Sequence, residues 1–205
     1  MALLNHVMGI ILKPKHEWLV IKEKNISTNQ LFTGYVAILA LLPVIAEFIG
    51  NCLIGIKLSE FMGSSFSYRV PIVSGLIYAV VSYFMAFVGI YLSAFIINAL
   101  APEFESKQNM NNALKLIAFS YTPVWIAEIF EILQTLSSLK VLGVYGLYLL
   151  YLGLEPMMET YSSKRIVFLI VVIFILVVVY MVVNLIVGLF EFSPTYQMIN
   201  SQIPF

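Results

Sequence analysis

Charged residues are scarce in this chain of 205 residues, and aspartate is absent altogether. Charged side chains make up 11% of the sequence, where about 25% is usual in soluble domains. All eleven acidic residues are glutamates, which excludes the aspartate-built calcium loop. Eleven basic residues balance them, so the chain lacks the positive excess that holds a nucleic acid. We therefore expect no nucleic-acid partner.

Cysteine is rarer still, since Cys52 is the single one. One thiol cannot form a disulfide within the chain or a cysteine-rich zinc site. The sequence also has no H-E-x-x-H run, no phosphate-cradling glycine loop and no recognisable pair of nucleophile and base. We predict that the protein is not an enzyme and that it holds no metal or cofactor.

Apolar residues are abundant instead, at 61% of the chain, against about 45 to 50% in ordinary domains. They gather in stretches close to the roughly 20 residues that a helix needs to cross a bilayer. A helix satisfies its own backbone groups, as lipid requires. The sequence predicts an all-α integral membrane protein, a bundle of five transmembrane helices with the lipid bilayer as its first partner. The predicted spans are residues 31–56, 70–101, 113–136, 139–154 and 166–190.

Two features of these spans carry further expectations. Ser137 and Ser138 leave a very short turn between the third and fourth spans, which predicts a tight antiparallel hairpin. The fifth span is almost unbroken valine, isoleucine, leucine and phenylalanine. We expect such a helix to face lipid over much of its surface.

Lysine and arginine are divided unevenly between the two sides of the spans, and short basic segments resist translocation. With the N-terminus inside, the cytoplasmic segments hold eight basic residues and the outer segments hold three, Lys57, Arg69 and Lys140. An odd number of spans then places the tail, residues 191–205, outside. We predict a cytoplasmic N-terminus, an external C-terminus and a prokaryotic plasma membrane.

Residues 1–30 are predicted to be a cytoplasmic segment rather than a cleavable signal, because no basic region precedes the apolar run Ala2–Leu12 and no clear small-residue site follows it. The run fits a short amphipathic helix on the inner membrane surface, with Trp18 as an interfacial anchor. The alternative is a helix packed on the cytoplasmic loops. Trp18 and Lys22 are the predicted docking residues of the inner face.

Three segments carry recognisable motifs. Residues 13–18 read KPKHEW before the first span, residues 119–125 read FSYTPVW in the third, and residues 143–154 read GVYGLYLLYLGL in the fourth. Together they resemble the Yip family of five-span proteins, named for eukaryotic members that bind Rab/Ypt GTPases. The resemblance covers roughly residues 10–190 and implies five helices with the N-terminus in the cytoplasm.

The resemblance has one departure. About thirty residues precede the first span, where eukaryotic members carry a long cytoplasmic region. The length resembles the prokaryotic branch of the family, whose biochemical role is generally unassigned. GTPase binding is therefore not carried over to this chain.

Polar residues inside the spans are costly and mark candidate functional sites. Glu47 and Glu128 lie about 22 to 24 Å along the first and third spans at roughly 1.5 Å per residue, in the outer half of the membrane. Asn51 lies one turn beyond Glu47, Glu131 one turn beyond Glu128, and Asn184 at a similar height in the fifth span. We expect these five residues to line one outward-opening cavity in which glutamates bind a cation or exchange a proton.

A simpler account of the same residues stays open. Glu131 and Asn51 would then only reach the outer interface, and Lys140 would pair with Glu128 or Glu131 across the hairpin turn.

Pro123 interrupts the third span, since it lacks an amide hydrogen and its ring crowds the carbonyl of Phe119. We expect a helix kink there. One interpretation is a packing kink whose released carbonyl is bound by neighbouring groups. The other is a break that exposes backbone oxygens to a cavity, as in transporters.

Small residues recur in the second and fourth spans and let helix backbones approach closely. We expect them to pack the bundle internally, and the alternative is a homo-oligomer interface. The residues are Ser82, Ala86, Gly89, Ser93, Gly143, Gly146 and Gly153.

Two functions remain. The resemblance favours a membrane-organising or protein-interaction role without catalysis, in which the N-terminal helix and the inner loops dock a partner at the cytoplasmic face. The alternative is a small cation or proton transporter or channel that uses the outer-half glutamates and the break at Pro123.

Overall fold

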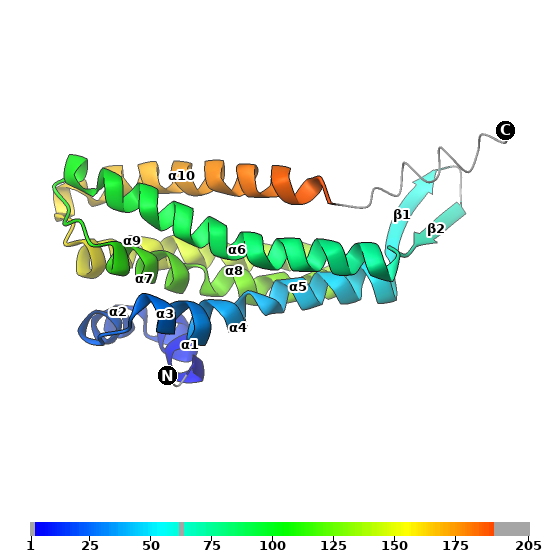
Figure 1. The fold of residues 1–205 in the computed structure, drawn as a ribbon, viewed down its shortest axis with the longest axis horizontal. Coiled ribbons are helices and arrows are strands. Elements are labelled where there is room, and N and C mark those ends of the chain that lie inside the picture. The colour runs from blue at the N-terminus through cyan, green and yellow to red at the C-terminus, as the bar shows by residue number, and fades with distance from the viewer. Residues whose placement is uncertain (1–2, 62–63, 191–205) are drawn as a thin grey trace.

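The computed structural model describes residues 3–61 and 64–190 and consists of a bundle of long helices with two short helices against one end (Figure 1). Within these residues, five helical segments are long and apolar enough to cross a bilayer. The predicted five-helix membrane fold is confirmed. The predicted external tail lies outside the described residues. The five segments are Thr28–Ile54, Ile72–Phe104, Met110–Ile132, Thr135–Met158 and Ser162–Gly188.

The N-terminal residues fold into two short helices, α1 (Leu3–Leu12) and α2 (Pro14–Glu23), which pack against each other. Pro14 separates them, since it has no amide hydrogen to continue α1 and is well placed in the first turn of α2. We call this end of the bundle the N-terminal end (Figure 1). We call the opposite end the hairpin end, because the β-hairpin that follows the first span lies there.

The first span starts at a capping box, in which Ser27 and Gln30 satisfy each other's backbone amides. It alternates between α and π geometry and ends at Gly55, whose φ of 97° is accessible to glycine at little cost. Its elements are α3 (Thr28–Leu31), η1 (Phe32–Val36), α4 (Ala37–Leu39), α5 (Leu41–Phe48) and η2 (Ile49–Ile54).

An antiparallel hairpin of β1 (Ile56–Phe61) and β2 (Ser64–Tyr68) follows the first span. No strand is predicted from the sequence in this connection. The second span is a single long helix, α6 (Ile72–Leu100), extended by the short η3 (Ala101–Phe104).

The third span is interrupted at Tyr121, two residues before Pro123, and tightens into 3₁₀ geometry after it. The chain reverses at Leu133, which is extended, and the following 3₁₀ helix takes in Ser137 and Ser138. The turn therefore comes earlier in the chain than predicted. The elements are α7 (Met110–Ser120), α8 (Thr122–Ala127), η4 (Glu128–Ile132), η5 (Gln134–Val144), α9 (Tyr145–Met158) and α10 (Ser162–Gly188).

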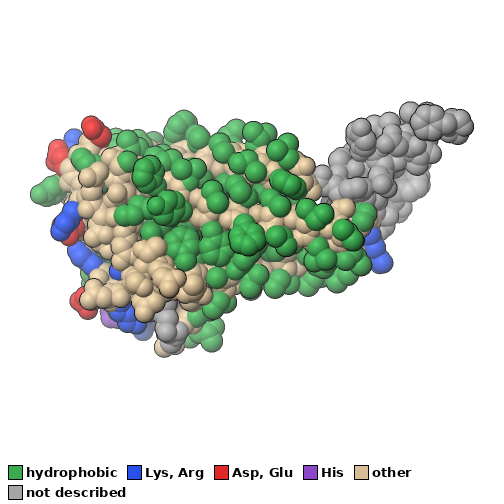
Figure 2. Space-filling view, in the orientation of Figure 1, with side chains coloured by type: hydrophobic (Ala, Val, Ile, Leu, Met, Phe, Trp, Pro, Cys, Tyr) green, Lys and Arg blue, Asp and Glu red, His purple; other side chains and the backbone are tan. Residues whose placement is uncertain are grey.

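The third span is the centre of the bundle, and α10 is at its edge. All residues of 113–120 are buried. Within the most apolar stretch of each span, 67% of the residues are buried in the third span but only 22% in the fifth. Figure 2 shows apolar side chains over the length of the bundle and charged ones gathered mainly at the N-terminal end. Lipid is the solvent that this apolar surface requires.

Candidate functional site

A cavity of about 480 Å³ extends from the middle of the bundle toward the hairpin end, and all five spans contribute to its walls. Most of the wall is apolar, with valine, leucine and isoleucine side chains and the indole of Trp125. Its polar residues are Glu47, Tyr78, Ser82, Ser120, Tyr121, Glu128, Glu131, Lys140, Tyr180 and Asn184. A volume of this size is typical of small-molecule sites.

Four of the five residues that the sequence placed in one cavity line it: Glu47, Glu128, Glu131 and Asn184. Asn51 is not among its lining residues. It lies in η2, where the π geometry puts more residues in each turn than an α-helix does. The residue one turn beyond Glu47 is therefore rotated away from the position that a 3.6-residue period gives it.

Charge in the cavity is unevenly compensated. Lys140 forms an ion pair with Glu131, which is one of the two pairings that the simpler account of these residues allowed. Glu128 lies within electrostatic range of Lys140 and of Glu47. Within the described residues Glu128 has no ion-pair partner. Three glutamates and one lysine leave the cavity with an excess of acidic groups.

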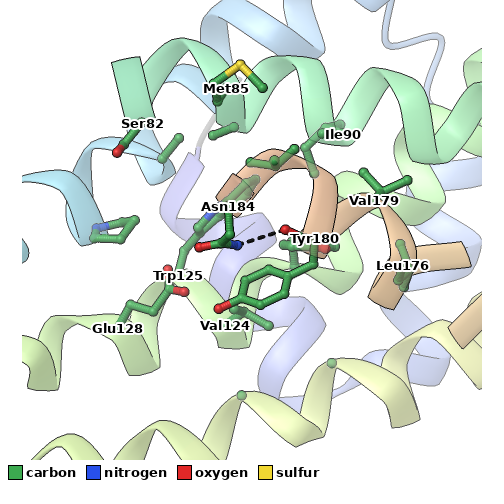
Figure 3. A pocket seen from close by; sticks show the side chains of 18 of the residues that line it. Ser82, Met85, Ile90, Val124, Trp125, Glu128, Leu176, Val179, Tyr180 and Asn184 are labelled. Atoms are coloured by element: carbon green, nitrogen blue, oxygen red, sulfur yellow. Dashed lines mark hydrogen bonds between the residues drawn. The ribbon is translucent and has the colours of Figure 1, made fainter. Parts of the chain in front are cut away.

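Asn184 is positioned by its own helix. Its amide nitrogen donates to the carbonyl oxygen of Tyr180 at 2.8 Å, one turn earlier in α10 (Figure 3). Figure 3 also shows Glu128 on the neighbouring α8–η4 segment, on the same side of the cavity as Trp125. Donation through nitrogen leaves the amide oxygen of Asn184 able to accept a further hydrogen bond.

Ser120 lines the cavity at the break in the third span. Its side chain is buried at 4% exposure, and its hydroxyl has no hydrogen-bond partner within the described residues. Its backbone carbonyl packs against Gly146, where a Cβ atom would come within 2.5 Å of that oxygen. The glycine is what allows α9 to approach the interrupted helix so closely.

The break at Pro123 is tied to the first span. The hydroxyls of Thr122 and Tyr35 lie 2.6 Å apart and are hydrogen-bonded. Backbone bonds bridge the break as well, since Tyr121 donates to Ile117 at 3.0 Å and accepts from Trp125 at 3.1 Å. Both interpretations of Pro123 have support, because the kink is packed on one side and borders the cavity on the other.

The predicted docking residues have different surroundings. Trp18 is buried at 1% exposure, and its indole nitrogen donates to the carbonyl of Leu149 at 3.1 Å. Its ring therefore holds α2 against α9, close to Gly153, where a Cβ would lie 2.7 Å from it. Lys22 is exposed and pairs with Glu159 at 3.7 Å.

Helix α1 combines the two environments that the sequence left as alternatives. His6 and Ile10 are buried against the bundle. Leu4, Met8 and Leu12, one turn apart from each other, are exposed. One side of α1 thus packs on protein, and another presents an apolar stripe.

A buried polar cluster at the N-terminal end is not predicted from the sequence. His6 Nδ1 lies 2.5 Å from Glu17 Oε1, and His6 Nε2 lies 3.2 Å from Lys24 Nζ. Lys115, also buried, donates to the carbonyls of Ile21 and Lys24 at 3.4 and 3.0 Å and so caps the end of α2. No local motif signals these contacts, because the helix boundary at Pro14 brings distant residues together.

Comparison with known proteins places the chain in a family. The family model described as the Yip1 domain matches residues 8–185. The inner membrane protein YohC of Escherichia coli, in strain K12 and in the O6:H1 strain CFT073, is 24% identical over 124 residues, or 60% of this chain. The alignment spans 62% of the length of YohC. No solved structure matches.

Proposed function

The chain belongs to the Yip1 domain family of integral membrane proteins, and we propose that it binds a cation in the cavity toward the hairpin end and carries the cation across the membrane. The role is one of binding and transport, without catalysis. The similarity to an inner membrane protein favours a plasma-membrane location. The basic residues at the N-terminal end favour a cytoplasmic position for that end.

One observation carries this proposal: Glu47, Glu128, Glu131 and Asn184 converge on a single cavity from three different spans. Ionisable side chains are costly at membrane depth and are retained where they meet a partner, water or an ion. Lys140 pairs with Glu131, and Glu128 has no ion-pair partner within the described residues. A bound cation would supply the missing positive charge.

The cavity is confined to one half of the bundle, an arrangement that suits transport by alternating access. It reaches toward the hairpin end, whereas the N-terminal half is closed by buried side chains of α7, α9 and α2. The interrupted segment between α7 and α8 lies where the two halves meet. Discontinuous helices of this kind are where transporter folds place their binding sites.

Flux measurements in proteoliposomes test the proposal. The parent protein should carry a cation or proton current above that of empty vesicles, and Glu128→Gln and Glu47→Gln should each reduce it at least tenfold. Glu103→Gln, an exposed glutamate at the N-terminal end, is the matched control and should leave the flux unchanged. Equal background leak in the parent and in both cavity variants would refute transport.

A second candidate function, the membrane-organising or docking role, is favoured by α1. Its exposed stripe of Leu4, Met8 and Leu12 is followed by the exposed Lys13 and Lys15. Apolar side chains beside basic ones are typical of helices that lie in an anionic membrane surface. On this proposal α1 enters the cytoplasmic leaflet while its buried side holds the bundle, and Lys22 belongs to the surface left for a protein partner.

Spin labels can locate this stripe in reconstituted protein. We expect a label at Met8→Cys to be accessible to oxygen and shielded from a water-soluble relaxing agent. A label at Lys15→Cys, exposed on α2, should behave in the opposite way. Both are made in a Cys52→Ala background, since Cys52 is the sole native thiol. Water-exposed labels at both positions would exclude insertion of α1.

A further inference from the structure

The walls of the cavity are more informative about its ligand than the glutamates alone. Apolar side chains of α6, α8, α9 and α10 form most of the lining, and the acidic residues lie toward the hairpin end. A hydrated metal ion or a proton needs no apolar space of about 480 Å³. The volume and its apolar surface fit an organic body of drug size.

The charge distribution selects the sign of such a ligand. Glu131 is paired with Lys140, whereas Glu128 has no ion-pair partner within the described residues and lies within electrostatic range of Glu47. The aromatic residues Trp125 and Tyr180 also line the cavity. Carboxylates together with aromatic faces are the groups that attract an organic cation.

The cavity opens sideways, along α10. Tyr180 and Val177 both line it, yet they are 61% and 50% exposed. They therefore stand at a rim where the cavity meets the lipid-facing surface of the bundle. A ligand with an apolar body can enter from the bilayer through such a rim, whereas a hydrated ion cannot.

A hydroxyl group at the deep end of the cavity has no hydrogen-bond partner within the described residues. The hydroxyl of Ser120 is buried at 4% exposure, lines the cavity and has no hydrogen-bond partner there. Buried hydroxyls are nearly always hydrogen-bonded. This group is placed to bind a polar atom of a ligand that reaches the break in the third span.

We propose that the ligand of the cavity is an amphiphilic organic cation, with its positive charge between Glu47 and Glu128 and its apolar body against α6 and α10, and that it enters from the outer leaflet beside Tyr180. The inference rests on the proposed function for the site and specifies its substrate class.

Tetraphenylphosphonium is a suitable probe, because it joins one positive charge to a large apolar body. Tetraphenylborate has the same shape with a negative charge, and tetramethylammonium has the charge without the body. Trp125 lies in the cavity wall, so its fluorescence in detergent-solubilised protein reports occupancy. We expect saturable quenching by tetraphenylphosphonium, at least tenfold weaker binding of both other ions, and no signal in Trp125→Phe.

Two variants separate charge from volume. Glu128→Gln should weaken tetraphenylphosphonium binding at least tenfold, with Glu103→Gln as the charge control. Ala86→Phe places a ring in the cavity and should also abolish binding. Val80→Phe adds the same ring to α6 at a position that is 54% exposed and outside the lining, and it should bind as the parent does.

The outcomes distinguish this inference from the proposal beneath it. Equal binding of tetraphenylphosphonium and tetraphenylborate, or unchanged binding in Glu128→Gln and Ala86→Phe, would overturn the substrate class. If flux of small cations still depended on Glu128 in that case, the transport proposal would stand with a different substrate. If that flux were also insensitive to Glu128, both proposals would fail.

Discussion

The two ends of the bundle treat their charged side chains in opposite ways. At the N-terminal end, ion pairs join Lys22 and Lys107 to Glu159, Lys164 to Glu105 and Arg165 to Glu155. In the cavity toward the hairpin end, Lys140 pairs with Glu131, while Glu128 has no ion-pair partner within the described residues. Paired charges fix the geometry of loops and helices, while an uncompensated group in a membrane cavity indicates a site for a ligand.

The two ends of the bundle also differ in how tightly their side chains pack. The N-terminal end is filled around Phe119, whose ring contacts those of His6, Trp18 and Tyr35. The hairpin half keeps a cavity of about 480 Å³ between its helices. We therefore expect substitutions at the N-terminal end to lower stability and those in the cavity to alter binding.

Trp18→Ala should have the largest effect. The buried ring and its hydrogen bond to Leu149 are both lost, and such truncations typically cost about 3 to 5 kcal/mol. Thermal unfolding in detergent, followed by size-exclusion chromatography, measures the loss. Leu19→Ala, at a position 55% exposed on the same helix, should stay within about 0.5 kcal/mol of the parent. A variant at Trp18 with parental stability and lost partner capture would instead make it a docking residue.

Glu17→Gln should come next. The variant weakens the buried contact between Glu17 and His6, and hydrogen bonds to charged groups contribute about 1.5 to 3 kcal/mol. Because this contact ties α1 to α2, we expect faster hydrogen exchange in the amides of α1. Glu23→Gln changes an exposed residue of α2 and should leave exchange unaltered. Parental protection of α1 in both variants would contradict the role given to the buried cluster.

Two hydroxyls at the break in the third span provide a sharper contrast. Thr122→Val leaves the buried hydroxyl of Tyr35 without its partner, at a cost of about 1 to 2 kcal/mol. Ser120→Ala removes a hydroxyl that has no partner within the described residues and should change stability by no more than about 0.5 kcal/mol. Unfolding midpoints measured side by side check both. A large loss in Ser120→Ala would mean that its hydroxyl already has a structural role.

The five spans could be predicted because a bilayer imposes its thickness on any helix that crosses it. Four cavity residues could also be predicted, since depth along a regular helix follows from residue number. Asn51 was misplaced because the π geometry of η2 is not visible in the apolar pattern. The hairpin turn was expected at Ser137 and Ser138, yet an extended Leu133 precedes a long 3₁₀ helix, a geometry that propensities do not predict.

Contacts between distant segments were the least predictable part. Trp18 resembles an interfacial anchor by its position after a basic segment, but Gly153 in α9 leaves room for its ring inside the bundle. Asn111 and Asn112 donate to the carbonyls of Ile26 and Met157 at 3.0 Å each, and no local sequence pattern signals these contacts. Such side chains are read correctly only once the packing of helices far apart in the sequence is known.

Lys140→Gln should have the smallest effect on stability and a distinct effect on binding. Its ion pair with Glu131 is 43% exposed at the lysine, so its loss should cost less than about 1 kcal/mol. Removal of this positive charge leaves Glu131 without its ion-pair partner. Tetraphenylphosphonium should then bind about twofold to fivefold more tightly, a gain of less than about 1 kcal/mol, as for the loss of one exposed ion pair. Lys164→Gln, 44% exposed and paired with Glu105 at the N-terminal end, should lose similar stability without any gain in affinity. Equal affinities in the two variants would show that the charge of the cavity does not select its ligand, and the contrast between the ends would then concern packing alone.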